Sequence, residues 1–408
     1  MALTSYLLQA GVTALWLGGA AYCLLALWAA RRFRSAAPAE AAESTPFVSL
    51  LKPLSGLERD LEGNLETFFF QDYPAYEILF AVSDASDPAL PVLERLRRRY
   101  PRVPMKVVET AVSPYPNAKV YSLEKMAQIA RADLLVISDS DVFVGADYLR
   151  AVVRPFADPQ VGVTTCVYRG TPGKSLWSQL EALAMSTEFM AGVLVAWALE
   201  GMKFALGPTM AVRRSCLAAI GGFSSMAEYL ADDFILGSWA ARAGYRVVLS
   251  SYVVNHQVLG ESFRSTFEHR LRWARSSRSS RPWGYVGEGF THLLPVAIGF
   301  LILTPQPLLA LTLVAATLTL RWLVTWEVGW GVLRDPGLRR RWWMVPLEDL
   351  LSFVVWCAGF TGRQIMWRGT AYTVGQDGRF QPVTPPALGP VAQSPGAQPE
   401  GCATAGHK

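Results

Sequence analysis

The first thirty residues of the chain carry no charged side chain. Leu7 to Ala30 gives 24 uncharged positions in a row, which is enough for an α-helix to cross about 30 Å of hydrocarbon. Arg31, Arg32 and Arg34 follow this stretch instead of preceding it, and this order disfavours a cleaved signal peptide. The positive-inside rule keeps such arginines in the cytosol. Residues 1–31 are therefore predicted to be a transmembrane helix, with the chain after residue 31 beginning in the cytosol.

A second apolar region occupies residues 289–363. Its first part is too long for one span and is interrupted by Pro305 and Pro307, which predicts two crossings joined by a turn at these prolines. Residues 345–362 are also apolar but contain two carboxylates, so they fit a full span, a re-entrant segment or an interfacial helix. Residues 382–408 are rich in proline and are predicted to be disordered.

The composition agrees with a protein that is anchored in lipid. Hydrophobic residues make up 51% of the chain and charged residues only 17%, whereas an ordinary soluble domain carries about 25% charge. The net charge of +5 is too small and too scattered to indicate a nucleic-acid-binding protein. The five cysteines and four histidines are dispersed, so neither a disulfide framework nor a zinc site is predicted.

Residues 45–260 alternate short β-branched runs with longer amphipathic segments, a pattern typical of strands joined by crossover helices. The sequence therefore predicts an α/β domain of the nucleotide-binding type, with a mainly parallel sheet. The predicted strands are Phe47–Leu54, Glu77–Val82, Met105–Val108 and Leu134–Ser138. The predicted helices between them are Leu61–Gln71, Ala89–Tyr100 and Val120–Arg131.

Acidic side chains follow two of these strands, at the carboxyl ends where such sheets bind ligands. Asp84 comes directly after the second strand, where it suits either a turn or a hydrogen bond to a base or ribose. Asp87, which precedes a proline at a helix start, is predicted to be an N-cap. Asp139 and Asp141 follow the fourth strand at alternate positions, so both carboxylates can point toward one hard cation that also binds phosphate oxygens.

A third acidic pair, Asp232 and Asp233, stands where a helix is predicted to begin and run to Arg242. Carboxylates in a first helical turn compensate the helix dipole, which is a purely structural role. One of the pair can serve that purpose while the other acts as a general base.

Residues 261–285 form a basic, aromatic segment in which arginines recur every three residues. This pattern predicts an interfacial amphipathic helix that lies on anionic lipid. Arg272 and Trp273 suit a further role, because a guanidinium can hold a departing diphosphate and a tryptophan can pack against a sugar.

Taken together, these residues resemble the ceramide glucosyltransferase family over nearly the whole chain. The matching segments are Lys52–Gly56, Asn64–Phe69, Asp72–Glu77, the loop at Asp84, Asp139, Asp233 and Arg272–Trp273. The resemblance implies a GT-A (nucleotide-diphospho-sugar transferase) fold with a mixed, mainly parallel sheet, flanked by N-terminal and C-terminal transmembrane helices. It further implies an inverting enzyme that transfers a hexose from a UDP-sugar, such as UDP-glucose, to the hydroxyl of a membrane lipid such as ceramide, with a divalent cation (Mg²⁺ or Mn²⁺).

The resemblance also implies roles for single residues. Asp84 would contact uridine, Asp139 with Asp141 would hold the metal and the diphosphate, and Asp233 would be the catalytic base. Arg272 and Trp273 would complete the family's Gln/Arg-x-x-Arg-Trp signature at the nucleotide sugar. This sequence departs from that signature at its first position, which is His269.

The departure at His269 makes the segment similar to bacterial hopanoid-linked glycosyltransferases, which predicts a bacterial inner-membrane protein with a cytosolic catalytic domain. The acceptor is then either ceramide or a hopanoid, and the second case corresponds to a hopanoid-linked N-acetylglucosaminyltransferase. A processive polysaccharide synthase and a non-catalytic membrane protein are the remaining alternatives. No motif specifies the sugar, the lipid or the oligomeric state.

Overall fold

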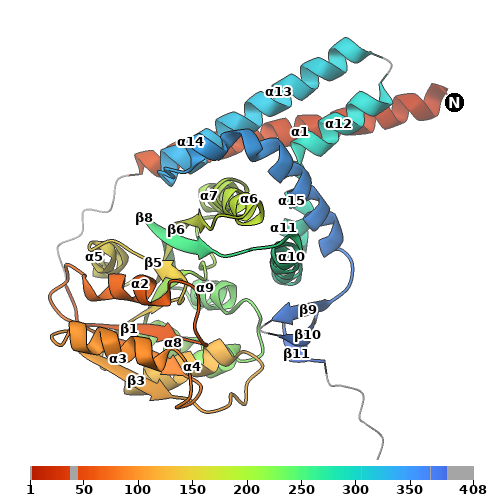
Figure 1. Ribbon diagram of the computed structural model, residues 1–408. Helices are drawn as coiled ribbons and strands as arrows, with labels where there is room; N and C mark the ends of the chain where they lie inside the picture. Colours follow the sequence, from red (N-terminus) through yellow and green to blue (C-terminus); the bar gives the residue numbers. More distant parts are fainter. Residues whose placement is uncertain (1, 37–44, 305, 368, 384–408) are drawn as a thin grey trace, which may run out of the picture.

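The computed structural model describes residues 2–36, 45–304, 306–367 and 369–383. Figure 1 shows three parts: a sheet domain, a layer of long helices along one side of it, and a small C-terminal sheet. The predicted disordered tail lies outside the described residues, apart from Pro382 and Val383.

The sheet domain is built on eight strands in the order β3-β2-β1-β4-β7-β6-β8-β5. The strands are β1 (Val48–Pro53), β2 (Tyr76–Val82), β3 (Met105–Glu109), β4 (Leu134–Ser138), β5 (Val142–Phe143), β6 (Val161–Pro172), β7 (Thr209–Arg213) and β8 (Arg246–Val258). The pairs β1–β2, β1–β4, β2–β3 and β6–β8 are parallel, while β7 runs antiparallel to both of its neighbours and β5 runs antiparallel to β8. The predicted mixed, mainly parallel sheet is therefore confirmed.

The helices of the sheet domain cover the sheet and connect its strands. They are α2 (Leu61–Glu66), α3 (Leu90–Arg99), α4 (Ala118–Ile129), α5 (Tyr148–Val153), α6 (Leu176–Ala184), α7 (Met190–Glu200), α8 (Arg214–Ala219) and α9 (Asp232–Arg242). The predicted helix at Val120–Arg131 begins two residues earlier, because the Asn117 side chain accepts a hydrogen bond from the backbone N–H of Val120 and caps α4. Asp87 does not cap α3 directly, since its carboxylate accepts from the backbone N–H groups of Gly56 and Ala89.

The remaining helices lie outside the sheet domain. They are α1 (Ala2–Ser35), α10 (Phe263–Ser280), α11 (Pro282–Gly287), α12 (Leu293–Leu303), α13 (Pro307–Thr325), α14 (Leu338–Arg341) and α15 (Val345–Gly359). In Figure 1, α1, α12, α13 and α14 form a layer above the sheet domain, and α15 leads down to α10 and α11 at its side. By length and composition, three helical segments among the described residues could cross a membrane: Leu7–Ser35, Leu176–Glu200 and Pro307–Val332. The chain is therefore a membrane-associated protein, and the N-terminal span is among its candidates.

The membrane segments differ from the prediction in two places. The helix α12 has only 11 residues, so it is too short to cross hydrocarbon by itself, and it forms a pair with residues 282–291 that is bent by 58°. The second difference is the segment Leu176–Glu200, which is long and apolar enough to cross a membrane although the sequence analysis did not predict a span there. More than half of it (56%) is buried inside the protein, against 22% of the N-terminal span. Figure 1 shows α6 and α7 end-on between the sheet domain and the helices α1 and α13.

Two arginines of the arginine-rich helix, Arg275 and Arg278, make protein contacts that the sequence did not reveal. The helix α10 packs against α15 and the small sheet. Arg278 donates to the carbonyls of Gly359 (2.6 Å) and Gly362 (2.8 Å), and Arg275 donates to those of Thr361 (3.1 Å) and Gln364. The carbonyl of Gly359 belongs to the last turn of α15, so Arg278 caps this helix, while the other three carbonyls lie in the segment that leads from α15 into β9.

The C-terminal sheet, which the sequence did not reveal, has three antiparallel strands: β9 (Gln364–Trp367), β10 (Thr370–Val374) and β11 (Phe380–Pro382). Its backbone binds the loop before α9, with the N–H of Phe380 donating to the carbonyl of Glu228 at 2.8 Å and that of Leu230 donating to Gly378 at 3.3 Å. The small sheet therefore fixes the loop that leads into Asp232 and Asp233.

Candidate active site

A cavity of about 760 Å³ lies between the edge of the central sheet and the helical layer. One end is lined by the acidic loop after β4 and by the start of α9, and the other end by α7, α10, α11 and α15. Five of the predicted site residues besides His269 line it: Asp139, Asp141, Asp233, Arg272 and Trp273. Acidic groups and apolar helices, far apart in the sequence, thus share one cavity.

The loop after β4 is held by two lysines. Lys119, in the first turn of α4, places its Nζ 2.7 Å from Asp139 Oδ1 and 3.7 Å from Asp232 Oδ2. Lys52, at the end of β1, is fully buried and donates to the carbonyl of Asp139 at 2.6 Å. Burial lowers the pKa of Lys52 to about 7, against the opposing charges of Asp139 and Asp141. Burial alone would also lower the pKa of Lys119, but Asp139 and Asp232 hold it above its ordinary value.

One carboxylate oxygen of Asp141 is buried and accepts no hydrogen bond from the described residues. This oxygen is Oδ1, whereas Oδ2 lies 3.5 Å from Nε2 of His256. A buried carboxylate oxygen without a partner is costly. This site therefore suits a positively charged ligand.

The two aspartates at the start of α9 have different surroundings. Asp232 is buried and accepts from the Asn117 side-chain amide at 3.3 Å. Asp233 faces the cavity, where its Oδ2 would lie 3.0 Å from a Cβ built on Gly207. Burial, followed by the charge of Asp232, raises the pKa of Asp233 to about 6. Asp232 thus serves the helix terminus and Lys119, and Asp233 is left to act in the cavity.

Gly207 marks the space between the acidic groups. A Cβ at this position would come within 3.0 Å of Asp233 Oδ2 and 3.9 Å of Asp139 Oδ2. Only glycine therefore leaves the gap between these two carboxylates open to a ligand.

Asp84 lies at the same edge of the sheet but outside the cavity. It follows β2, which pairs with β1, which in turn pairs with β4, and all three run in parallel. Because neighbouring strands are about 4.8 Å apart, Asp84 lies roughly 10 Å along the edge from Asp139. Its exposed carboxylate accepts from the backbone N–H of Ser86 at 2.8 Å and from the hydroxyls of Ser83 and Ser86. These hydrogen bonds hold the pKa of Asp84 below its ordinary value, and the bond from the Ser86 hydroxyl has the largest effect.

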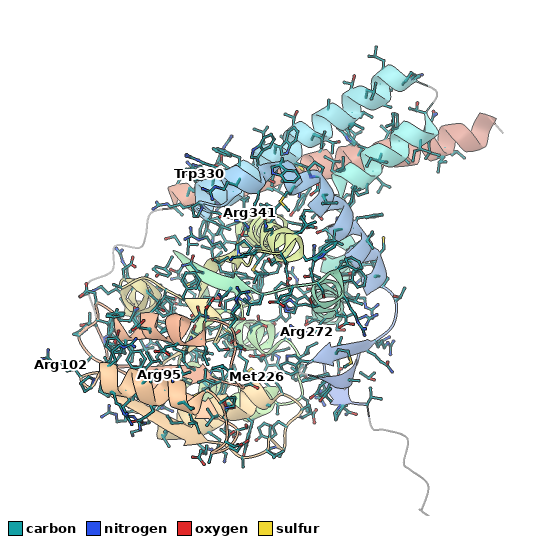
Figure 2. All side chains as sticks on the ribbon, viewed as in Figure 1. Arg95, Arg102, Met226, Arg272, Trp330 and Arg341 are labelled. Atoms are coloured by element: carbon teal, nitrogen blue, oxygen red, sulfur yellow. The ribbon has the colours of Figure 1, made fainter. Side chains whose placement is uncertain are left out.

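The remaining predicted residues come from α10. Figure 2 shows Arg272 on the side of α10 that faces the sheet domain, and Arg272, Trp273 and His269 all line the cavity. His269 binds the buried carboxylate of Glu181 in α6 through Nδ1, and its ring centre lies 4.5 Å from that of Trp273. The imidazole therefore connects α6 to Trp273, so the residue that departs from the family signature has a defined place in the site.

Sequence reasoning missed Lys52, Lys119 and Glu181. Two of them left a signal in the sequence. Lys52 is the one charged residue of the strand Val48–Pro53, and a lysine is almost never fully buried without a polar partner. Lys119 stands in the first turn of a helix, where a positive charge opposes the helix dipole and needs a negative neighbour. Nothing in the sequence pairs Glu181 with His269, because the two lie 88 positions apart.

The residues present fit a divalent cation only in part. No three His, Cys, Asp or Glu side chains in the described portion of the chain lie close enough together to hold a metal ion by themselves. The unsatisfied Oδ1 of Asp141 and the open space beside Gly207 nonetheless suit a cation that takes its other ligands from phosphate oxygens. Asp139 and Asp141 would hold such an ion.

The mixed sheet and its acidic edge define the class of the protein as a GT-A glycosyltransferase. A similar fold occurs in a mannosyltransferase from Pyrobaculum calidifontis, solved in complex with GDP-Man and Mn²⁺, with a TM-score of 0.50 and 21% identity over 85% of this chain and 98% of that chain. The profile of glycosyl transferase family 21 matches residues 11–380. The chain belongs to this family of sugar-transferring enzymes.

Curated relatives agree with the family. Ceramide glucosyltransferase 3 of Caenorhabditis elegans is 25% identical over 233 residues, which is 57% of this chain and 50% of the relative. The ceramide glucosyltransferase of Komagataella phaffii is 36% identical over 101 residues, or 24% of this chain and 20% of the relative. The chain spans about half the length of the first of these relatives and less of the second. The predicted resemblance to ceramide glucosyltransferases is thus confirmed.

Proposed function

We propose that this protein transfers a hexose from a UDP-sugar to a hydroxyl of a membrane lipid. The observation that carries this proposal is the single cavity, which joins the carboxylates Asp139, Asp141 and Asp233 to helices apolar enough to lie in a membrane. A soluble acceptor would not need a cavity whose other end is lined by apolar helices such as α7 and α15. The relatives named ceramide glucosyltransferases favour UDP-glucose as the donor and ceramide as the acceptor.

In this mechanism the donor lies along the edge of the sheet. Asp84 is proposed to contact uridine, about 10 Å along the sheet edge from the diphosphate end at Asp139. Mg²⁺ or Mn²⁺ held by Asp139 and Asp141 would neutralise negative charge on the diphosphate. Arg272 holds the same diphosphate from α10, and His269 and Trp273 border the sugar.

The proposed reaction is a single displacement with inversion. Asp233 takes the proton of the lipid hydroxyl, the oxygen of that hydroxyl forms a bond to the anomeric carbon, and the bond from that carbon to the diphosphate breaks. Stabilisation of the charge on the leaving diphosphate is worth roughly 3–4 kcal/mol for each preorganised group. The expected product is a lipid glycoside with the opposite anomeric configuration to the donor.

The charges after the first span and the number of candidate spans bear on the orientation of the protein in the membrane and on the alternative functions. Arg31, Arg32 and Arg34 at the end of the first span favour a cytosolic sheet domain, in a bacterial inner membrane if the acceptor is a hopanoid. His269 supports that alternative acceptor. A processive synthase would need enough spans to enclose a channel, whereas the described residues offer three candidates, or four if the bent pair counts as one.

A direct assay tests the proposal. The purified full chain in lipid nanodiscs is given radiolabelled UDP-glucose or UDP-N-acetylglucosamine, Mn²⁺ or Mg²⁺, and either ceramide or a hopanoid alcohol. We expect label in a lipid-extractable product. Label in an insoluble polymer would favour a processive synthase, and release of free sugar alone, with no labelled lipid, would overturn the proposal.

The raised pKa of Asp233 predicts the pH dependence of the reaction. A general base acts only when deprotonated, so kcat/KM is expected to rise through about pH 6 and level off above it. At about pH 5 the rate should be roughly a tenth of the plateau, because one unit below the pKa about a tenth of the carboxyl is ionised. Initial rates at lipid concentrations well below KM, between about pH 5 and pH 8, measure kcat/KM, and a flat profile would contradict the base role of Asp233.

A further inference from the structure

The end of the cavity that faces the helical layer is polar, although it lies among apolar helices. We call it the inner polar pocket, and it consists of Tyr22, Glu188, Arg270, Glu288, His292 and Ser352, all of which line the cavity. Glu188 belongs to the candidate span Leu176–Glu200, and Glu288 belongs to the bent pair at residues 282–303. Ionisable groups in segments that can span a membrane are rare and mark functional sites.

Hydrogen bonds fix Glu188 in the inner polar pocket. Ser352 donates to one carboxylate oxygen of Glu188, and Thr291 donates to the other at 3.2 Å. His292 lies 3.6 Å from the same carboxylate. Glu188 stands in a π-helical segment, Met185–Phe189, a local distortion that is frequent at functional sites.

Two donors at this end of the cavity are left unsatisfied. Arg270 is 8% exposed, and its Nη2 binds Glu348 at 3.0 Å and also Ser352, but its Nη1 has no hydrogen-bond partner in the described part of the chain. The buried hydroxyl of Tyr22 also has none there. Buried donors are almost always paired in native proteins, so these two point to a ligand that offers an acceptor oxygen.

Glu288 adds an acceptor that the fold does not use. No other described side chain forms a hydrogen bond or ion pair with its carboxylate, and the side chain lines the cavity. The inner polar pocket therefore presents carboxylate acceptors at Glu188 and Glu288 and free donors at Arg270 and Tyr22. A group with both a donor and an acceptor, such as an amide or a hydroxyl, matches this arrangement.

We propose that the inner polar pocket binds a second polar group of the acceptor lipid, an amide or an additional hydroxyl, while the reacting hydroxyl lies at Asp233. This inference rests on the proposed function and narrows its substrate class: the acceptor headgroup carries hydrogen-bonding groups beyond the one that receives the sugar. Lipids with one hydroxyl and no further donor would leave the Glu288 carboxylate without a partner, and a site built for hydrogen bonds rejects such analogues strongly. An amide-bearing sphingoid lipid and a hopanoid polyol share the required chemistry.

The test measures acceptor selectivity of the full chain in nanodiscs. The acceptors are ceramide, ceramide methylated on the amide nitrogen, a hopanoid polyol, and 1,2-diacylglycerol with matched chains. We expect kcat/KM for the better of the two polar acceptors, ceramide or the hopanoid polyol, to be about 50-fold or more above kcat/KM for diacylglycerol. A preference for ceramide that the N-methyl analogue loses identifies the amide as the bound group, and a preference for the polyol identifies hydroxyls.

Glu288→Gln separates recognition from folding, because its carboxylate is not used by the fold. We expect the variant to raise KM for the preferred acceptor about tenfold, with kcat, the KM for UDP-sugar and the rate on diacylglycerol little changed. Glu268→Gln, an exposed glutamate on α10 paired with Arg264, is the matched control. Equal efficiency of the wild type on all four lipids, or an equal loss on all four in Glu288→Gln, would overturn the inference. Absence of transfer to any lipid would instead remove the proposed function itself.

Discussion

Asp233→Asn is expected to lower kcat for sugar transfer by about 10³-fold, in the middle of the range for loss of a general base. The amide has the size of the carboxylate but cannot take the proton of the acceptor hydroxyl. Donor binding should persist, since Asp139, Asp141 and Arg272 are unchanged. The measurement is the initial rate with saturating radiolabelled UDP-sugar, together with the shift in Tm that UDP and Mn²⁺ produce.

Stability separates a chemical defect from an unfolded variant. Burial raises the pKa of Asp233 to about 6, so above that pH the ionised carboxylate weakens the fold, and a neutral amide should not lower Tm near pH 7. Glu94→Gln, on the exposed face of α3 where the glutamate pairs with Arg97 and Arg98, is the control and should retain full activity. A kcat of Asp233→Asn within about threefold of wild type would rule out Asp233 as the base.

The first half of the sheet could be predicted because its strands are buried on both faces. Residues of β1, β2 and β4 are buried throughout, so these strands appear in the sequence as mostly apolar runs. Once these strands were placed, the acidic residues that follow them had to share one edge of a parallel sheet. Asp139 and Asp141 were found in this way.

The second half of the sheet depends on contacts that no local pattern contains. The strands β6 and β8 are long and pair across some 85 residues, with register shifts along the way. Between them in the chain lies Leu176–Glu200, whose helices contact β6 on one side and α1 and α15 on the other. Hydropathy cannot distinguish burial in protein from burial in lipid, and the sequence therefore left this helix unassigned.

The positive charges of the arginine-rich helix are ambiguous in a similar way, because their sequence pattern does not tell whether they bind lipid or protein. Arginines at a spacing of three lie along one side of a helix, and that side suits anionic lipid or any other row of oxygen atoms. For Arg278 these oxygens are the carbonyls of Gly359, the last residue of α15, and of Gly362, which lie 81 and 84 positions further along the chain. The role of Arg275 and Arg278 is set by where another helix ends, and a single-sequence pattern cannot supply that.

The carboxylates of the acidic loop differ in how cleanly they can be tested. Removal of Asp139 would leave Lys119, now 2.7 Å away, as a largely buried charge without its main partner, and the fold would suffer. Asp141 has a buried oxygen with no partner among the described residues, so its neutralisation costs the fold little. Asp141→Asn is therefore the sharper test of cation binding.

Without added ligands, Asp141→Asn is expected to melt at or slightly above the Tm of the wild type, because the buried Oδ1 of Asp141 accepts no hydrogen bond from the described residues. With UDP and Mn²⁺ at about 100 times the Kd, the wild type should gain about 2.7 kcal/mol of stability, whereas the variant should gain almost none at the same concentrations. Transfer activity should fall by about 10²-fold or more, on the scale of lost charge stabilisation at the leaving group.

The two measurements on Asp141→Asn, the Tm without ligands and the stabilisation by UDP with Mn²⁺, test different hypotheses. If UDP with Mn²⁺ stabilises Asp141→Asn as much as the wild type, then Asp141 does not hold a cation that bridges the diphosphate. If the variant instead melts well below the wild type without ligands, Asp141 serves the fold through His256, which lies 3.5 Å away. His256→Gln distinguishes these cases, since it removes the imidazole and keeps the Asp141 carboxylate: under the cation hypothesis it should retain the stabilisation by UDP and Mn²⁺ that Asp141→Asn loses.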